Sequence, residues 1–154
     1  ADAVKFQTFI ADLMLTKYAK QADYQKRNIG FETSQFEMIK KLELPLIEFE
    51  SLKKHCDDCS IDFISSAFDS QSLDYIANLK PAFFKWPSGE ITNRTLIEQG
   101  IGFNLPIVFS TGMCDLDEVE KLFNFVNNRI KRLIELDYIE EKTINNSKMY
   151  NYVL

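Results

Sequence analysis

Four short, nearly continuous apolar segments recur along the chain, and stretches with helical periodicity separate them. Segments of this kind are typical of strands that are covered on both faces, as in a parallel sheet. The apolar segments are residues 3–9, 61–68, 82–86 and 106–110, and the helical patterns are residues 34–42, 46–59, 70–79 and, less regularly, 95–100. Because strands and helices alternate, the sequence predicts βαβ units and an α/β fold with a parallel sheet.

The spacing of the strands favours a barrel over an open sheet. Strand starts near residues 61, 82 and 106 recur at intervals of 21 and 24 residues, which suits compact (β/α) units. A complete eight-stranded barrel takes about 250 residues. We therefore expect an incomplete (β/α)8 TIM barrel with about four parallel strands. The chain enters its first strand from Ala1 without an initiating Met, so we expect it to be a piece of a longer protein.

The C-terminal part has a different character. Asp115 with Glu118 three residues later resembles a capping box, and apolar side chains from Val119 to Ile134 mark one face of a following helix. Residues 138–144 and 148–154 then read as two strands about a polar turn, which predicts a β-hairpin. We accordingly divide the chain into a partial barrel domain, residues 1–125, and a divergent helix and hairpin-like tail, residues 126–154. Residues 15–33 are interpreted as an excursion after the first strand.

Charge and composition exclude several classes of protein. The formal net charge is −5, which argues against a general surface for nucleic acid or other polyanions, so any phosphate site must be local. No apolar run approaches the roughly 18 to 20 residues of a membrane span, and no secretory signal is recognisable. The three cysteines do not form a disulfide framework. We expect a soluble, cytoplasmic protein without a membrane partner.

Polar side chains inside the apolar strands are the first indication of a site. Lys5 and Gln7 lie two residues apart in the first strand and therefore point to the same side of the sheet. Lys85 lies among the aromatic residues of the third strand. A buried charge without a partner costs several kcal/mol or more, so lysines at such positions need a reason.

Small hydroxyl residues follow the last three strands: Ser65 and Ser66, then Ser88, then Ser110 with Thr111. Hydroxyls and backbone N–H groups at strand-to-helix turns are a common way for α/β folds to hold phosphate. Each turn alone is a weak signal, but three of them beside two strand lysines predict a pocket for a small, multiply charged anion.

These residues occur in motifs that resemble the N-acetylneuraminate synthase family. The motifs are VKFQTF (4–9), KYA (17–19), SQFEMIKKLEL (34–44), ISSAFD (64–69), FKWPSGEITN (84–93) and STGM (110–113). The likeness runs in order from residue 1 to about residue 125. It implies a TIM-barrel synthase that condenses phosphoenolpyruvate with an N-acylated hexosamine of the N-acetylmannosamine type, or with a legionaminic or pseudaminic acid precursor.

The resemblance also implies roles for single residues. The positions that match phosphoenolpyruvate-binding residues of the family are Lys5, Gln7, Ser66, Lys85, Ser88 and Ser110. Glu90 matches a glutamate that contacts the acceptor sugar, and Phe68 matches an aromatic side chain that lines the same pocket. The resemblance thus makes Lys5, Lys85 and Glu90 the catalytic candidates.

The family implies a divalent metal ion, manganese or magnesium, and a homodimer. The sequence departs from the family pattern because a preceding strand with a sugar-contacting glutamate, two metal-binding histidines and a C-terminal antifreeze-like domain are absent. No metal-ligating residue is assigned. We therefore expect impaired catalysis, and the alternatives are an inactive truncated product or a remnant that binds phosphoenolpyruvate. Trp86 is also bulkier than the usual residue at its position.

Two further signals offer other classes of function. Cys56 and Cys59 form a C-x-x-C motif beside His55, which would suit zinc or redox chemistry, but a structural zinc needs four ligands and we favour reduced cysteines near a helix end. The tail faintly resembles the last helix and wing of a winged-helix DNA-binding domain, in which Arg129, Lys131 and Arg132 would face phosphates.

Overall fold

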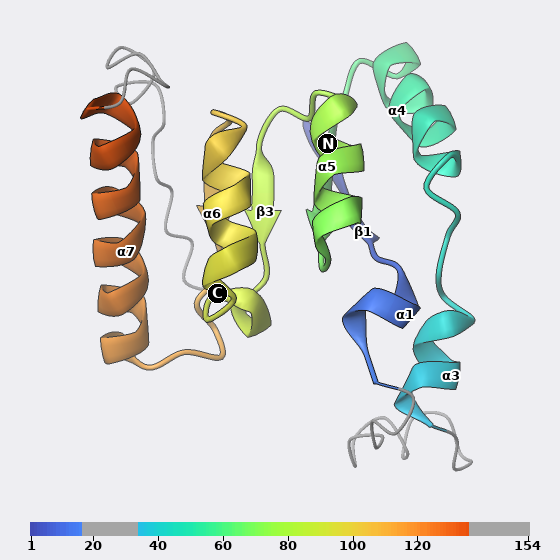
Figure 1. Ribbon diagram of the computed structural model, residues 1–154. Coiled ribbons are helices and arrows are strands. Elements are labelled where there is room, and N and C mark those ends of the chain that lie inside the picture. Colours follow the sequence, from blue (N-terminus) through green and yellow to red (C-terminus); the bar gives the residue numbers. More distant parts are fainter. Residues whose placement is uncertain (17–33, 136–154) are drawn as a thin grey trace.

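The structure, a computed structural model, describes residues 1–16 and 34–135. Its strands are β1 (Ala3–Thr8), β2 (Asp62–Ala67), β3 (Phe84–Trp86) and β4 (Ile107–Phe109). Strand β1 pairs in parallel with β2, and β3 pairs in parallel with β4. Strands β1 and β3 run in the same direction (Figure 1). The α/β class with parallel strands is thereby confirmed, whereas no ladder joins the two pairs within the described residues and the barrel stays a prediction.

The helices are α1 (Ala11–Met14), α3 (Gln35–Lys40), α4 (Glu48–Asp58), α5 (Ser70–Asn78), α6 (Arg94–Gly102) and α7 (Leu116–Glu135), with a 3-10 turn, η1 (Ser88–Glu90). In Figure 1, α7, α6, α5 and α4 follow one another across the view, and α1 and α3 lie together below α4. The predicted helices are confirmed within a few residues, but α1 was not predicted. Most of the excursion at 15–33 lies outside the described residues.

Side chains from the preceding loops start the helices. The Asp69 carboxylate accepts a hydrogen bond from Ser72 N at the start of α5, and the Asn93 side chain caps α6 in the same way. Before α7, Asp115 N donates to the Glu118 carboxylate at 3.1 Å, while Glu118 N donates to Asp115 Oδ1 at 2.8 Å. The predicted capping box is therefore confirmed.

Helices α4, α5 and α6 end in the same way. The residue that follows each C-cap has a positive φ, 55° at Ser60, 53° at Lys80 and 56° at Asn104. A left-handed residue directly after a helix lets the chain reverse, which satisfies the last carbonyl groups. Each of these turns leads the chain back toward the next strand.

The core lies between the strands and the helices. Its largest fully buried side chains include Phe49 of α4, Phe63 of β2, Phe84 of β3, Phe109 of β4 and Ile97 of α6. Burying one large side chain of this kind stabilises a fold by about 1.5–3 kcal/mol. One face of each strand pair thus packs against this core, and the other face carries polar side chains together with the buried Ile64 and Val108.

Trp86 belongs to this core and is only 2% exposed. A Cβ atom at Gly100 of α6 would overlap the indole ring, so the glycine leaves the space that the large side chain occupies. The bulk of Trp86, which had no explanation at the sequence level, is therefore accommodated by the absence of a side chain on the facing helix.

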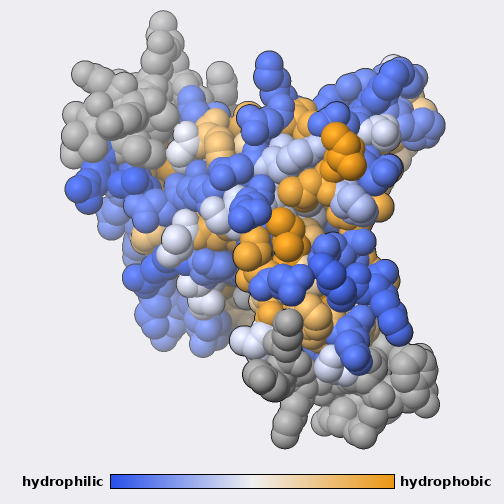
Figure 2. Space-filling view, turned by 45° about the vertical axis from the view of Figure 1, so that its right-hand side comes forward, coloured by the Kyte–Doolittle hydropathy of each residue, from blue (hydrophilic) through white to orange (hydrophobic). Residues whose placement is uncertain are grey.

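Hydrophobic residues also reach the surface near α3 and α4. Figure 2 shows hydrophobic surface between polar regions on the side that carries these helices. The exposed large hydrophobic residues of this part of the chain are Leu13, Leu42, Leu44 and Ile47. They lie outside the core that positions the strands.

Helix α7 continues across the predicted boundary between residues 125 and 126. Leu122 and Val126 are buried in the core, and Arg129 forms an ion pair of 2.8 Å with Glu98 of α6. The start of the predicted tail thus packs against the α/β fold, while the hairpin at 138–154 lies outside the described residues. Within the described residues, no helix is long and apolar enough to cross a membrane.

Candidate functional site

The pairing of β1 with β2 places three of the candidate residues on one face. Lys5 lies opposite Ile64 and Gln7 lies opposite Ser66, and residues that face each other or lie two apart share a face of the sheet. Val4 and Phe6 on the alternate positions pack against the core. Lys5, Gln7 and Ser66 therefore lie on the face that points away from the helices.

The second strand pair has the same arrangement. Phe84 and Trp86 are buried in the core, so Lys85 between them points to the opposite face. The Lys85 ammonium donates to Ser110 Oγ at 2.5 Å and to the Trp86 carbonyl oxygen at 2.8 Å. Ser110 directly follows β4, so one lysine connects the carboxyl ends of two neighbouring strands.

The two lysines lie within electrostatic reach of each other. Partial burial lowers the pKa of Lys85, and repulsion from the Lys5 ammonium lowers this pKa further. A cation that disfavours the charged form of a neighbouring lysine contributes to a local positive potential in an acidic protein. The part of the fold that carries the two lysines is therefore suited to an anion.

Ser66 adds an unused hydrogen-bonding group to this face. Its Oγ atom is buried and has no partner among the described residues. By contrast, the neighbouring Ser65 on the core side is paired, because its hydroxyl and that of Thr8 lie 2.7 Å apart. Buried hydroxyls in proteins are normally hydrogen-bonded, so the unpaired one of Ser66, on the face that carries Lys5, is a group available to a ligand.

The turns after the strands carry the other candidates. Ser88 and Glu90 lie in η1 directly after β3, and the Glu90 carboxylate accepts a hydrogen bond of 3.0 Å from Asn93 Nδ2. The Ser88 carbonyl oxygen accepts from Cys114 Sγ at 3.6 Å, which ties this turn to the one after β4. Phe68 follows β2, is partly exposed and meets the ring of Phe9 edge to face at 6.4 Å.

The candidates thus fall into two groups. In the first group, Lys5, Gln7 and Ser66 lie on one face of the β1–β2 pair, and Lys85 reaches Ser110 at the end of the β3–β4 pair. Ser88, Glu90 and Phe68 lie in the turns at the carboxyl ends of β3 and β2. The sequence interpretation gave no role to Asp69, a buried carboxylate in the turn after β2, although its place before a helical pattern marks it as an N-cap.

The two cysteines of the C-x-x-C motif lie at the end of α4 in different environments. Cys56 is buried in the core, whereas Cys59 is exposed and lies 3.8 Å from His55 Nε2. Across residues 1–16 and 34–135, no three His, Cys, Asp or Glu side chains are grouped as metal ligands. The described residues therefore do not fit the divalent metal ion that the resemblance implies.

The lowered pKa of Lys85 predicts a pH dependence of stability. Below its pKa in the folded chain, Lys85 is charged in both states and its desolvation lowers stability. As the pH rises from that value to 10.5, the unfolded chain binds more protons at Lys85 than the folded chain does. The free energy of unfolding therefore increases with pH across this range. We expect unfolding of the ligand-free wild type, compared with Lys85→Met, to become relatively harder across this window. A pH-independent difference between the two proteins would contradict this assignment.

Comparison with known proteins identifies the family. The sequence model of the NeuB family matches residues 1–141. An N,N'-diacetyllegionaminic acid synthase of Legionella pneumophila is 44% identical over 77% of this chain and 33% of its own length. The corresponding synthase of Campylobacter jejuni is 41% identical over 86% of this chain and 40% of its own length.

A solved structure shows the same fold. The sialic acid synthetase of Leptospira borgpetersenii matches with a TM-score of 0.66 and 22% identity, over 84% of this chain and 40% of its own. The chain thus spans about a third to two-fifths of the length of these relatives. Since the family model matches residues 1–141, which is most of the sequence, the chain belongs to the NeuB family.

Proposed function

We propose that this chain carries the phosphoenolpyruvate-binding part of a synthase that condenses phosphoenolpyruvate with an N-acylated hexosamine. The observations that support the proposal are the Lys5 ammonium, which lies close enough to lower the pKa of Lys85, and the buried, unpaired Ser66 hydroxyl on the face that carries Lys5. Phosphoenolpyruvate has a phosphate and a carboxylate, and two ammonium groups with nearby hydroxyl donors match that charge distribution. We also propose that the four strands form part of a barrel that closes around this face.

Each candidate residue then has a role. Lys5 and Lys85 oppose the phosphate and the carboxylate, and Gln7, Ser66, Ser88 and Ser110 donate hydrogen bonds to them. Ser110 Oγ already accepts from Lys85, which leaves its own hydrogen free to donate. Glu90 and Phe68 contact the acceptor sugar from the turns after β3 and β2.

The proposed reaction forms one carbon–carbon bond and releases phosphate. C3 of phosphoenolpyruvate attacks the aldehyde of the open-chain sugar, water adds at C2, and phosphate leaves by cleavage of its C–O bond. The product is a nine-carbon 2-keto sugar acid. The protein's part in this sequence is to hold the anionic substrate with its C3 atom toward the sugar and to stabilise the negative charge of the departing phosphate. No step at a metal ion is included, because the described residues do not form such a site.

The acceptor that we favour is the hexosamine precursor of a diacetylated legionaminic acid. This choice is supported by the relatives named N,N'-diacetyllegionaminic acid synthase, which are 44% and 41% identical, compared with 27% for a pseudaminic acid synthase of Helicobacter pylori. Calorimetric titrations of the chain loaded with phosphoenolpyruvate separate the three acceptors: this precursor, N-acetylmannosamine and the pseudaminic acid precursor. Tighter binding of either of the latter two would overturn the choice.

Catalysis by the 154-residue chain alone is expected to be weak or absent. The chain spans about two-fifths or less of its relatives' length, and each lost electrostatic contact to a reacting group typically costs about 10²–10³ in rate. We expect no detectable condensation product, while calorimetry still detects one molecule of phosphoenolpyruvate bound per folded chain. Robust turnover would refute the impairment, and a folded sample without heat of binding would refute the proposed site.

The remaining expectations stay predictions. These are the cytoplasmic location, the homodimer and the division at residue 125. In the winged-helix alternative, three cationic side chains would face phosphates. One of them, Arg129, forms an ion pair with Glu98 of α6 within the α/β fold. No described contact favours the DNA-binding function, and the proposal does not include it.

A further inference from the structure

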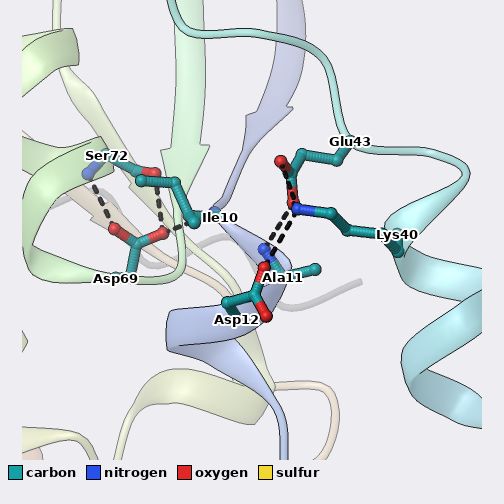
Figure 3. Close-up of polar contacts among 7 residues, drawn as sticks. All are labelled: Ile10, Ala11, Asp12, Lys40, Glu43, Asp69 and Ser72. Carbon is teal, nitrogen blue, oxygen red and sulfur yellow. Dashed lines mark hydrogen bonds and ion pairs between the residues drawn. The ribbon is translucent and has the colours of Figure 1, made fainter. Parts of the chain in front are cut away.

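The first backbone N–H groups of a helix have no carbonyl acceptors within the helix. At the start of α1, two such consecutive groups are those of Ile10 and Ala11. Ile10 is the N-cap, and its side chain cannot accept a hydrogen bond. Carboxylates from distant parts of the chain take this role instead (Figure 3). Ile10 N donates to Asp69 Oδ2 at 2.8 Å, and Ala11 N donates to Glu43 Oε2 at 2.7 Å.

Asp69 also holds the start of another helix. Its Oδ1 atom accepts from Ser72 N at 2.8 Å, and its Oδ2 atom accepts from Ser72 Oγ at 2.6 Å in addition to Ile10 N. The residue is only 7% exposed. Hydrogen bonds to a charged acceptor are stronger than neutral ones, so this one carboxylate fixes the chain after β1 to the start of α5.

The two segments that Asp69 joins are the ends of the strands that carry the site. Ile10 lies three residues after Gln7, and Asp69 lies three residues after Ser66 and directly after Phe68. Beside the carboxylate, Phe68 N donates to the Thr8 carbonyl oxygen at 3.2 Å. The distance between the ends of β1 and β2 is thus set just beyond Gln7 and Ser66.

We propose that Asp69 is a positioning residue of the substrate site, which keeps Gln7, Ser66 and Phe68 in register by tying Ile10 to the start of α5. This inference rests on the function proposed above. Asp69 does not itself contact substrate in this scheme. It acts by keeping the ends of β1 and β2 from separating when the site is empty. Binding of substrate then costs less conformational entropy.

Asp69→Asn separates this role from simple helix capping. Asparagine is as good an N-cap as aspartate, so its one oxygen can still accept from Ser72 N. The amide NH2 group then replaces the oxygen that faces Ile10 N, and two donors oppose each other. We expect the Ile10 amide to exchange with solvent faster, and the Kd for phosphoenolpyruvate to rise about tenfold.

Ser72→Ala is the matched control. It removes the hydroxyl that donates to Asp69 Oδ2 but leaves the bond to Ile10 N in place. We expect its Kd for phosphoenolpyruvate to change by less than about twofold. If Asp69→Asn does not fold, Asp69→Ser takes its place, because the serine hydroxyl still caps α5 but is too short to reach Ile10.

The outcomes separate the two proposals. Titrations of the whole 154-residue chain with phosphoenolpyruvate, at a temperature where circular dichroism shows every variant to be folded, support the positioning role if only the Asp69 variant weakens. Equal affinity in wild type and Asp69 variant overturns that role and leaves the proposed function standing. Equal weakening by Ser72→Ala also overturns it, because the contact between Asp69 and the start of α5 would then explain the effect without the bond to Ile10. Absence of binding by the wild type overturns both.

Discussion

We expect the double variant Lys5→Ala/Lys85→Ala to lose phosphoenolpyruvate binding in calorimetry while remaining folded. A lysine and a phosphate about 4 Å apart attract each other by roughly 4 kcal/mol at an effective dielectric constant near 20. After the cost of desolvation, about 2 kcal/mol per lysine is a reasonable net value. Removal of both should therefore weaken binding about 10³-fold, which takes it beyond detection for a substrate bound in the micromolar range.

The matched control is Lys53→Ala/Lys54→Ala. It changes the net charge by the same amount, but these lysines pair with Asp57 and Asp58 on the outer surface of α4. Exposed pairs one turn apart contribute little to stability, so the control should fold normally and keep its affinity. Equal loss of affinity in both double variants would mean that the chain binds anions by its overall charge, and the proposed site would be wrong.

Gly100→Ala is expected to destabilise the fold by about 3 kcal/mol, because its Cβ atom would overlap the buried Trp86 ring. The indole is rigid, and Phe84 and Phe109 pack against it at 6.1 and 6.0 Å between ring centroids. The ring therefore cannot move aside without disturbing β3 and β4. Chemical denaturation measures the loss of unfolding free energy directly.

Gly102→Ala is the control on the same helix. No atom lies within 4 Å of the added methyl group, and the residue is exposed at the end of α6. Since alanine loses less backbone entropy than glycine on folding, this variant should gain about 0.5 kcal/mol. A Gly100→Ala protein as stable as Gly102→Ala would show that the indole does not occupy this space.

The strands and the longer helices could be predicted because their patterns are local. Strand β1 alternates core and polar positions, so the sequence alone was enough to place Lys5 and Gln7 on one face. Helix α1 could not be predicted, because four residues are too few to show a period. Its first N–H groups depend on Asp69 and Glu43, which are 59 and 32 residues away in the sequence.

The site was predictable in its residue types and only partly in its geometry. Lys85 among aromatic residues was visible as an anomaly, but its bonds to Ser110 and the Trp86 carbonyl depend on the pairing of β3 with β4. The effect of the Lys5 ammonium on the pKa of Lys85 depends on how the two strand pairs are placed, which sequence spacing does not encode. The fit of Trp86 over Gly100 likewise required the position of α6.

The central claim is that the carboxyl ends of four strands form one cradle for phosphoenolpyruvate, and a crystal structure of the chain with phosphoenolpyruvate tests it most directly. We predict one bound molecule whose phosphate or carboxylate oxygens lie within hydrogen-bond distance of Lys5 Nζ, Lys85 Nζ and Ser66 Oγ. Phosphoenolpyruvate bound elsewhere, with the two ammonium groups turned toward opposite rims and Ser66 Oγ still unpaired, would contradict it.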